Sequence, residues 1–268
     1  MNKTEEFYKE ILKRKVVNVE DLKEISKMLF EADDDYYYRK YIQKVLKEGK
    51  VGKIRKGLYY GVPLDKLEDY FEVDRYITGD KIKKGNALAY HTALELHGAA
   101  HSAHGRVFVL VTKKDRFRKF NFQDVEYVPV VNKHDIGHIT RIEYENTSLS
   151  VTDPARNFVD SLSRPDLCGG WEECLKSLAN LKGLSLSEVK EVISAYDNKT
   201  LELKCGYVLE LLSKNSPYYD HIQIEDLHPL KPPQEWKPVY IDRDVPSELK
   251  EDWGLYIPEG LEDLLRGV

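Results

Sequence analysis

The stretch Tyr36–Val62, YYYRKYIQKVLKEGKVGKIRKGLYYGV, constrains the fold of this chain more than any other segment. Its pattern predicts an amphipathic helix, a tight turn and a β-hairpin, which is the order of recognition helix and wing in a winged helix-turn-helix. Between residues 38 and 56 eight of the nine charged residues are basic, and Glu48 is the only acid. A local basic stripe of this kind indicates a surface that attracts a polyanion, above all duplex DNA.

The stripe is a local feature, because the chain as a whole is acidic. The formal charge of the 268 residues is −5. Residues 1–62 hold 15 basic and 11 acidic residues, a net charge of +4, which leaves −9 for residues 63–268. We therefore expect DNA binding to reside in the first 62 residues, since an acidic second part is a poor partner for nucleic acid.

Apolar residues of the predicted helix recur at helical spacing and predict its buried face: Tyr38, Tyr41, Ile42, Val45 and Leu46. The other face and the hairpin supply the candidate DNA-binding residues: Tyr37, Arg39, Lys40, Gln43, Lys44, Lys47, Lys53, Arg55 and Lys56. Gln43 is the best candidate base reader, because an amide can form two hydrogen bonds with adenine. The three wing residues are expected to contact phosphate without reading sequence.

Three acids, Asp33 to Asp35, precede the predicted recognition helix. They either stabilise the helix N-terminus through the helix dipole, or repel phosphates and so sharpen specificity. The sequence leaves both roles open.

The remaining sequence predicts a mixed α/β chain of the α+β type. We expect a winged helix domain over residues 1–62, a connecting segment with a short helix over 63–85, and a C-terminal α+β domain over 86–268. Strands of one small sheet are predicted at 107–112, 125–131, 139–144 and 149–152. Helices are predicted at 86–98, 153–162, 170–181, 185–196 and 201–213, followed by irregular structure from Pro217 onward. Asp153 followed by Pro154 marks the start of the second of these helices.

No pattern in the chain predicts catalysis, a cofactor or a metal. Four of the eight histidines, His91, His97, His101 and His104, lie within fourteen residues. His97 and His101 have the spacing of a helical metal pair, but Gly98 should end the helix between them, so packing or surface roles are favoured. A metal-dependent nuclease would need acids on neighbouring strands, and no such pair is visible; phosphate-binding, dinucleotide-binding and nucleophile motifs are also missing. We therefore predict that the protein is not an enzyme.

The expected compartment is the cytoplasm. Three cysteines, Cys168, Cys174 and Cys205, lack metal or redox spacing and do not suggest a disulfide framework. No apolar run is long enough to span a bilayer and no signal peptide is visible, so no membrane partner is expected.

Five blocks follow one another along the chain: KGLY from Lys56, YHTALELHG from Tyr90, VTDPARNFVDSL from Val151, RP at Arg164, and GGWEE from Gly169. Together these blocks resemble the AbiEi family. The resemblance covers roughly residues 5–215, and the block that begins at Asp153 is its most specific part. Ala155 and Asn157 depart from the Glu and Thr that the family often shows there.

This resemblance implies an antitoxin and transcriptional repressor of an abortive-infection toxin–antitoxin system in viral defence. The implied partners are double-stranded DNA, as the inverted repeats of its own promoter, and a nucleotidyltransferase-like toxin that is counteracted with or without direct contact. Arg156, Asp160 and Arg164 stand four residues apart, so they either form one exposed charged ladder as the antitoxin surface or only fix the helix against its neighbours. Two alternatives stay open: a stand-alone regulator whose second domain senses a ligand or protein, and, with least support, a DNA nuclease.

Overall fold

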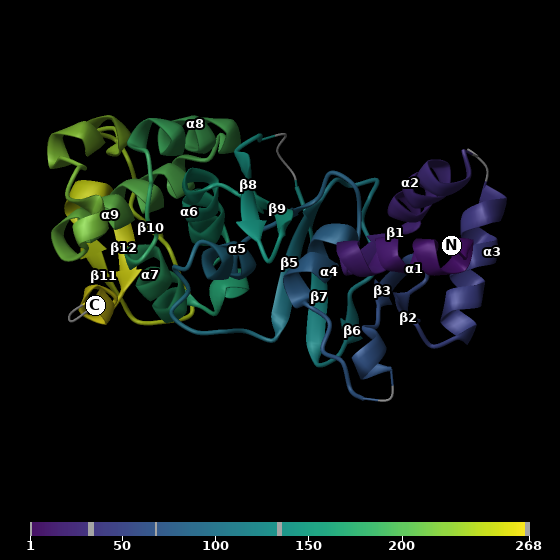
Figure 1. Ribbon diagram of the computed structural model, residues 1–268. Helices are drawn as coiled ribbons and strands as arrows, with labels where there is room; N and C mark the ends of the chain where they lie inside the picture. The colour runs from purple at the N-terminus through teal and green to yellow at the C-terminus, as the bar shows by residue number, and fades with distance from the viewer. Residues whose placement is uncertain (1, 32–34, 68, 133–135, 266–268) are drawn as a thin grey trace. The chain divides into compact units, whose positions relative to one another are not determined.

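The first six elements of the chain follow one another in the order of a winged helix (Figure 1). They are α1 (Lys3–Arg14), β1 (Val16–Asn18), α2 (Val19–Phe30), α3 (Asp35–Lys47), β2 (Val51–Arg55) and β3 (Leu58–Gly61). Strand β3 lies between β1 and β2 and is antiparallel to both. The computed structural model describes residues 2–31, 35–67, 69–132 and 136–265. The helix and the hairpin that the sequence predicts between residues 36 and 62 are confirmed.

Local sequence signals explain where these elements begin and end. The Asn18 side chain accepts a hydrogen bond from the Asp21 N–H, and the Asp21 carboxylate accepts one from the Asn18 N–H, which closes a capping box at the start of α2. Gly49 follows α3 with φ of 71°, and Gly57 forms the wing turn with φ of 83°. Both angles lie in the left-handed region that glycine adopts without a steric penalty, so a turn at each position is built into the sequence.

Two compact units make up the chain. Unit 1 comprises Met1–Ala87, Gly105–Val131 and Glu143–Leu149, and unit 2 comprises Leu88–His104, Asn132–Ile142 and Ser150–Val268. Residues 105–131 and 143–149 thus belong to unit 1, although the sequence places them in the C-terminal domain. The chain was expected to divide once, but it passes between the units several times.

Unit 1 adds helix α4 (Arg75–Lys81) and three strands to the winged helix. Strand β7 (Val125–Val131) pairs in parallel with β5 (Arg106–Val111) and antiparallel with β6 (Phe120–Phe122). The turn between β6 and β7 consists of Gln123 and Asp124, both with positive φ, which is the geometry of a two-residue hairpin. Strand β6 is not predicted from the sequence, because a strand of three residues is too short to show an alternating pattern.

Tyr60 of β3 joins the wing to these added strands. Its ring stacks on Phe71, with centroids 6.3 Å apart, and meets Phe122 of β6 at 5.8 Å. The ring also lies across Gly52 of β2, where an added Cβ atom would stand 2.1 Å from its Cζ atom. Only glycine therefore fits opposite Tyr60 in the wing.

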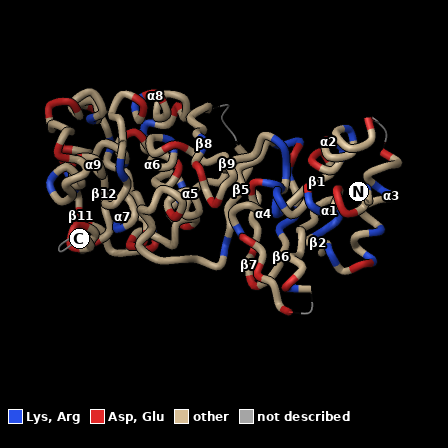
Figure 2. Tube along the Cα trace, in the orientation of Figure 1, with Lys and Arg blue, Asp and Glu red and all other residues tan. Residues whose placement is uncertain are grey.

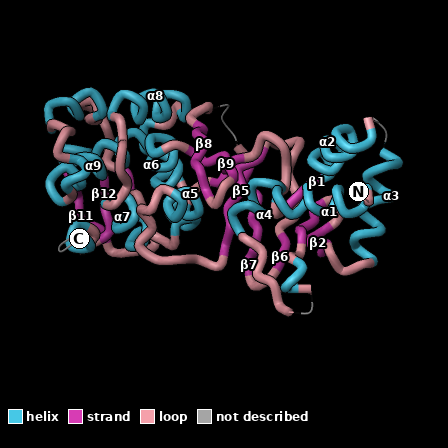
Figure 3. Tube along the Cα trace, in the orientation of Figure 1, coloured by secondary structure: helices cyan, strands magenta, loops and turns pink. Residues whose placement is uncertain are grey.

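Unit 2 is largely helical, with short strands at its edges (Figure 3). Its helices are α5 (His91–Leu96), α6 (Pro154–Ser163), α7 (Trp171–Ala179), α8 (Leu186–Tyr196) and α9 (Lys199–Asn215). Leu88 of strand β4 (Ala87–Leu88) pairs in parallel with Val151 of β9 (Thr147–Thr152). Strand β8 (Ile139–Tyr144) is the other neighbour of β9 in the sheet. Helix α6 begins as predicted, because the Asp153 carboxylate accepts a hydrogen bond from the Arg156 N–H.

Two predicted elements of unit 2 are wrong. The helix expected at 86–98 starts only at His91, because Tyr90 has φ of 55° and ψ of −133°, which no α-helix contains. The segment from Pro217 is not irregular throughout. It contains a sheet of β10 (Val239–Tyr240), β12 (Leu255–Pro258) and β11 (Ser247–Lys250), in that order, and short 3₁₀ turns. These strands have two to four residues each, too few for a periodic signal.

The protein has a mixed α+β fold, as the sequence predicts, but besides the sheet of the wing its described residues form two sheets where one was expected. All three cysteines are free and buried, in agreement with the expectation of no disulfide. Among the described residues, no helix combines the length and the apolar composition that crossing a membrane requires.

Candidate nucleic-acid interface

Helix α3 is amphipathic, and packing fixes which face it shows to solvent. Tyr38, Ile42 and Val45 are 8, 4 and 0% exposed and pack with side chains of α1, α2 and β2. Residues three and four apart lie on one face of a helix, so burial of this stripe turns the opposite stripe outward. That stripe is exposed and consists of Lys40, Gln43, Lys44 and Lys47. Figure 2 shows lysine and arginine positions along α3 in blue. The predicted division of the helix into two faces is confirmed.

The outward stripe is chemically available. Lys44 Nζ donates to the Thr4 hydroxyl at 2.9 Å, and Lys40 Nζ lies 5.6 Å from the centre of the Tyr36 ring. Within the described part of the chain, the three lysines form no ion pair and the Gln43 amide makes no side-chain hydrogen bond. The stripe therefore carries three positive charges around an amide with donors and acceptors to offer.

Tyr37 and Arg39, two further candidates, are engaged within the protein. The Tyr37 ring is half-buried and stacks on Phe30 with centroids 5.2 Å apart. Arg39 is exposed, but its guanidinium donates to the Asp35 carboxylate at 2.9 Å and to the Tyr38 hydroxyl at 3.2 Å. A DNA contact by either residue would have to compete with these interactions, so for both it stays a prediction.

Asp35 is the first residue of α3, whereas Asp33 and Asp34 lie outside the described residues. Its carboxylate pairs with Lys23 at 2.7 Å and with Arg39 at 2.9 Å. The hydrogen bond from Lys23 holds the pKa of Asp35 below its usual value. Asp35 thus stands where the helix dipole favours an acid, and its charge is offset by two neighbouring cations.

The wing places two lysines and one arginine differently. Lys53 and Lys56 are exposed, and Lys56 lies in the turn between β2 and β3. Arg55 is partly buried, because its guanidinium lies 4.7 Å from the centre of the Phe120 ring and 5.7 Å from that of Phe117. Arg55 therefore fastens the wing to β6 and the preceding loop, and its contact with phosphate stays a prediction.

A pocket of about 260 Å³ beside the wing adds cations that the sequence analysis did not select. Lys83 and Lys84 line it together with Lys56 of the turn and Asn18 at the start of α2. The signal was visible in the sequence as the basic run Lys81–Lys84, but nothing local showed that the fold brings this run back to the wing. These lysines extend the positive surface of unit 1 beyond the predicted residues.

The predicted antitoxin surface is wrong in its main part. Arg156 and Asp160 are each 1% exposed, so no charged ladder reaches solvent along α6. Arg164 is exposed but pairs with Asp166 at 2.8 Å instead of continuing the series. Arg156 and Asp160 share one face of α6, as their spacing of four residues indicates, but this face packs inside unit 2. Spacing alone does not show which face of a helix is buried.

Arg156 is the centre of a buried polar network in unit 2. Its Nε donates to Asp160 at 3.3 Å, and its two terminal nitrogens donate to the carbonyls of Ile136 and Gly137 and to the Asn132 side chain. The Tyr196 hydroxyl donates to the other Asp160 oxygen. A buried charge needs such hydrogen-bond partners, because no water solvates it. The same hydrogen bonds connect α6 to Ile136 and Gly137 and to α8.

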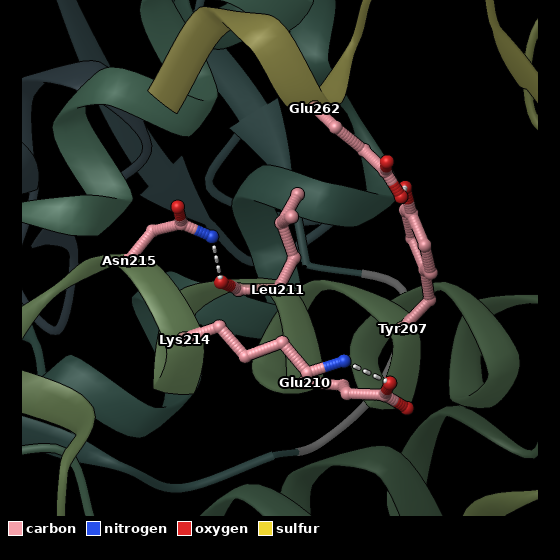
Figure 4. A pocket seen from close by; sticks show the side chains of 6 residues that line it. All are labelled: Tyr207, Glu210, Leu211, Lys214, Asn215 and Glu262. Carbon is pink, nitrogen blue, oxygen red and sulfur yellow. Dashed lines mark hydrogen bonds and ion pairs between the residues drawn. The ribbon is translucent and has the colours of Figure 1, made fainter. Parts of the chain in front are cut away.

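A pocket of about 340 Å³ lies along α9 in unit 2 (Figure 4). Its polar groups already have partners: Lys214 pairs with Glu210 at 2.6 Å, and Tyr207 donates to Glu262 at 2.9 Å. Lys250 also pairs with Glu262, at 3.0 Å. These contacts hold the C-terminal segment against α9, and they leave the pocket without a group that points to a reaction.

Comparison with known proteins shows the fold only. No protein-family description matches the chain, and no curated protein matches it. The crystal structure of the Rv2827c protein from Mycobacterium tuberculosis is similar, with a TM-score of 0.62 and 18% sequence identity. The similarity covers 94% of this chain and 88% of that one, so the whole α+β arrangement has a solved counterpart.

The burial of Arg156 leads to a stability prediction. Replacing Arg156 with Leu should lower the free energy of unfolding by about 3–5 kcal/mol, because Asp160 would be left as an unpaired buried charge. Replacing Arg164 with Ala is the control and should cost at most about 1 kcal/mol, since its pair is exposed. Urea denaturation followed by circular dichroism measures both. Equal effects for the two variants would contradict the buried network.

Proposed function

We propose that the protein is a DNA-binding transcriptional repressor that recognises its operator with α3 and the wing. The observation that carries the proposal is the exposed stripe of Lys40, Gln43, Lys44 and Lys47 on a helix whose opposite face is buried. A winged helix of this element order is suited to placing such a helix in the major groove. The wing lysines then lie along the backbone of the same duplex.

The residues of the interface have different tasks in this proposal. Lysine is a point charge that neutralises phosphate and carries no sequence information. Gln43 is the group with both a donor and an acceptor, which a base edge in the major groove requires. Affinity therefore comes mainly from Lys40, Lys47, Lys53 and Lys56, and sequence preference from Gln43.

We further propose that the protein is the antitoxin of an abortive-infection toxin–antitoxin system, which it also represses by binding its own promoter. The support is the resemblance of the blocks around Tyr90 and Asp153 to the AbiEi family. A promoter with inverted repeats would be bound by two copies, one on each half-site. A nucleotidyltransferase-like toxin is the proposed target, and both activities belong in the cytoplasm.

The first test concerns base reading by α3. We expect Gln43→Ala to weaken binding to the promoter duplex by about 1–3 kcal/mol and to leave binding to random duplex unchanged. Lys47→Ala should weaken both by similar factors, because it removes a phosphate contact. Gel-shift titrations measure both, with the exposed Lys9→Ala on α1 as a neutral control. If Gln43→Ala and Lys47→Ala bind both duplexes like the parent, the assignment of this face is wrong.

The second test concerns the wing. In the Lys53→Ala/Lys56→Ala variant the plot of log affinity against log salt concentration should become less steep by about 0.9 for each lost phosphate contact. The loss should be the same on promoter and random duplex. Lys113→Ala/Lys114→Ala, in the exposed turn after β5, is the matched control. An unchanged slope in the wing variant would remove the wing from the interface.

The third test separates repression from antitoxin activity in the full-length chain. Combining Lys40→Ala, Gln43→Ala and Lys47→Ala should abolish repression of a promoter reporter, because three surface contacts with DNA are lost. The same variant should still rescue growth of cells that express the cognate toxin from an independent promoter. Loss of rescue by a folded variant would make antitoxicity depend on DNA binding, and failure of the unaltered protein to rescue would refute the antitoxin proposal alone.

A further inference from the structure

Three side chains that are far apart in the sequence meet inside unit 2. They are His91, the first residue of α5, His104 at the end of the following loop, and Glu173 in the first turn of α7. Each offers a possible metal-ligand atom, and these atoms all lie within 4.8 Å of one another. Among the described residues, this is the one group of histidine, cysteine and acidic side chains with that property.

The hydrogen bonds of His91 fix which ring nitrogen carries its lone pair. Its Nε2 lies 2.9 Å from the carbonyl oxygen of Ser102, and a carbonyl only accepts, so Nε2 must carry the hydrogen. The side chain is fully buried, and burial favours the neutral form of the ring. Its Nδ1 then holds a lone pair, is buried, and has no hydrogen-bond partner among the described residues.

The Nδ1 atom of His91 lies near a carboxylate. Nδ1 of His91 is 4.0 Å from Oε1 of Glu173. The same oxygen accepts hydrogen bonds from the Ser102 N–H at 2.9 Å and from the Ser177 hydroxyl at 3.2 Å. Two electron-rich atoms thus lie 4.0 Å apart in the interior of unit 2, an arrangement that a cation would stabilise.

The surroundings hold the ligands in place and add negative charge. The Glu95 carboxylate accepts from the His104 N–H at 3.0 Å and lies 3.7 Å from Nε2 of His91. Gly169 leaves room for the cluster, because an added Cβ atom would stand 2.7 Å from Cε1 of His104 and 2.8 Å from Cγ of Glu173. A side chain at residue 169 would therefore displace two of the three ligands.

We propose that His91, His104 and Glu173 form a structural site for a divalent transition-metal ion, of which Zn²⁺ is the simplest case. Two imidazoles and one carboxylate are an ordinary zinc ligand set, with metal–ligand distances of about 2.0–2.2 Å. The Ser102 carbonyl that holds the other nitrogen of His91 is the outer partner that a ligating histidine usually has. The ion would join α5, the loop before β5 and α7.

Binding requires one movement. The rings of His91 and His104 stack with centroids 3.7 Å apart and 13° between their planes, so their in-plane lone pairs do not converge. His104 belongs to a loop, and rotation about its side-chain bonds turns its ring toward the ion while His91 and Glu173 stay in place. The fourth position falls to water or to Glu95.

The test uses the full-length protein after treatment with EDTA. Titration calorimetry with Zn²⁺ should show one ion per chain, and the melting temperature should rise when the ion is added. Co²⁺ in its place should give the visible absorption bands of a tetrahedral site. Glu173→Gln and His104→Ala should each weaken Zn²⁺ binding at least about 100-fold, because each removes a ligand.

The control is His101→Ala, an exposed histidine of the same loop, which should bind Zn²⁺ like the parent. Circular dichroism of the metal-free variants shows whether each is folded, and a folded Glu173→Gln that loses the ion supports the site. The proposal is overturned if the parent chain takes up no stoichiometric Zn²⁺ at micromolar concentration. It is equally overturned if folded Glu173→Gln and His104→Ala bind as tightly as the parent.

Discussion

Burial of one side of α3 is the constraint on which the proposed interface depends. Tyr38, Ile42 and Val45 lose nearly all of their contact with water, and each such side chain contributes about 1.5–3 kcal/mol when fully buried. This packing fixes the rotation of the helix about its axis, so the lysines on the opposite side need no specific contact to be held outward. The electrostatic surface is thus a consequence of hydrophobic packing.

Elements whose signals are local could be predicted from the sequence. The capping box at Asn18, the Lys56–Gly57 turn and the start of α6 at Asp153 each depend on residues within four positions of one another. Local signals did not predict whether a residue is buried where its partners are distant in the sequence. The charges of Arg156 and Asp160 have surface spacing, yet they are buried because Tyr196 and the carbonyls near residue 136 complete their hydrogen bonds. Helical spacing shows which residues share one face of a helix, and the neighbouring elements decide whether that face is exposed to solvent.

The histidines illustrate the same limit. Spacing drew attention to His97 and His101, but His97 bonds to the Thr152 carbonyl at 2.8 Å and His101 is exposed. The pair that meets is His91 and His104, thirteen positions apart, and its third member comes from α7. The loop after α5 folds back so that its backbone groups bond both Glu95 and Glu173. Residues that a loop brings together in this way have no regular spacing in the sequence, so the sequence does not predict the cluster.

The contact between Gly52 and Tyr60 bears on which duplexes the proposed interface would accept. Because the Tyr60 ring is held by Phe71 and Phe122, the wing is clamped to the strands behind it and does not act as a free arm. The separation between α3 and the tip of the wing is then set before DNA arrives. A helix and a wing held at a fixed separation would fit only those duplexes in which the distance from the groove to the neighbouring backbone matches that separation. Duplexes with narrowed or widened grooves would then bind differently because of their shape, even where the base pairs contact no side chain.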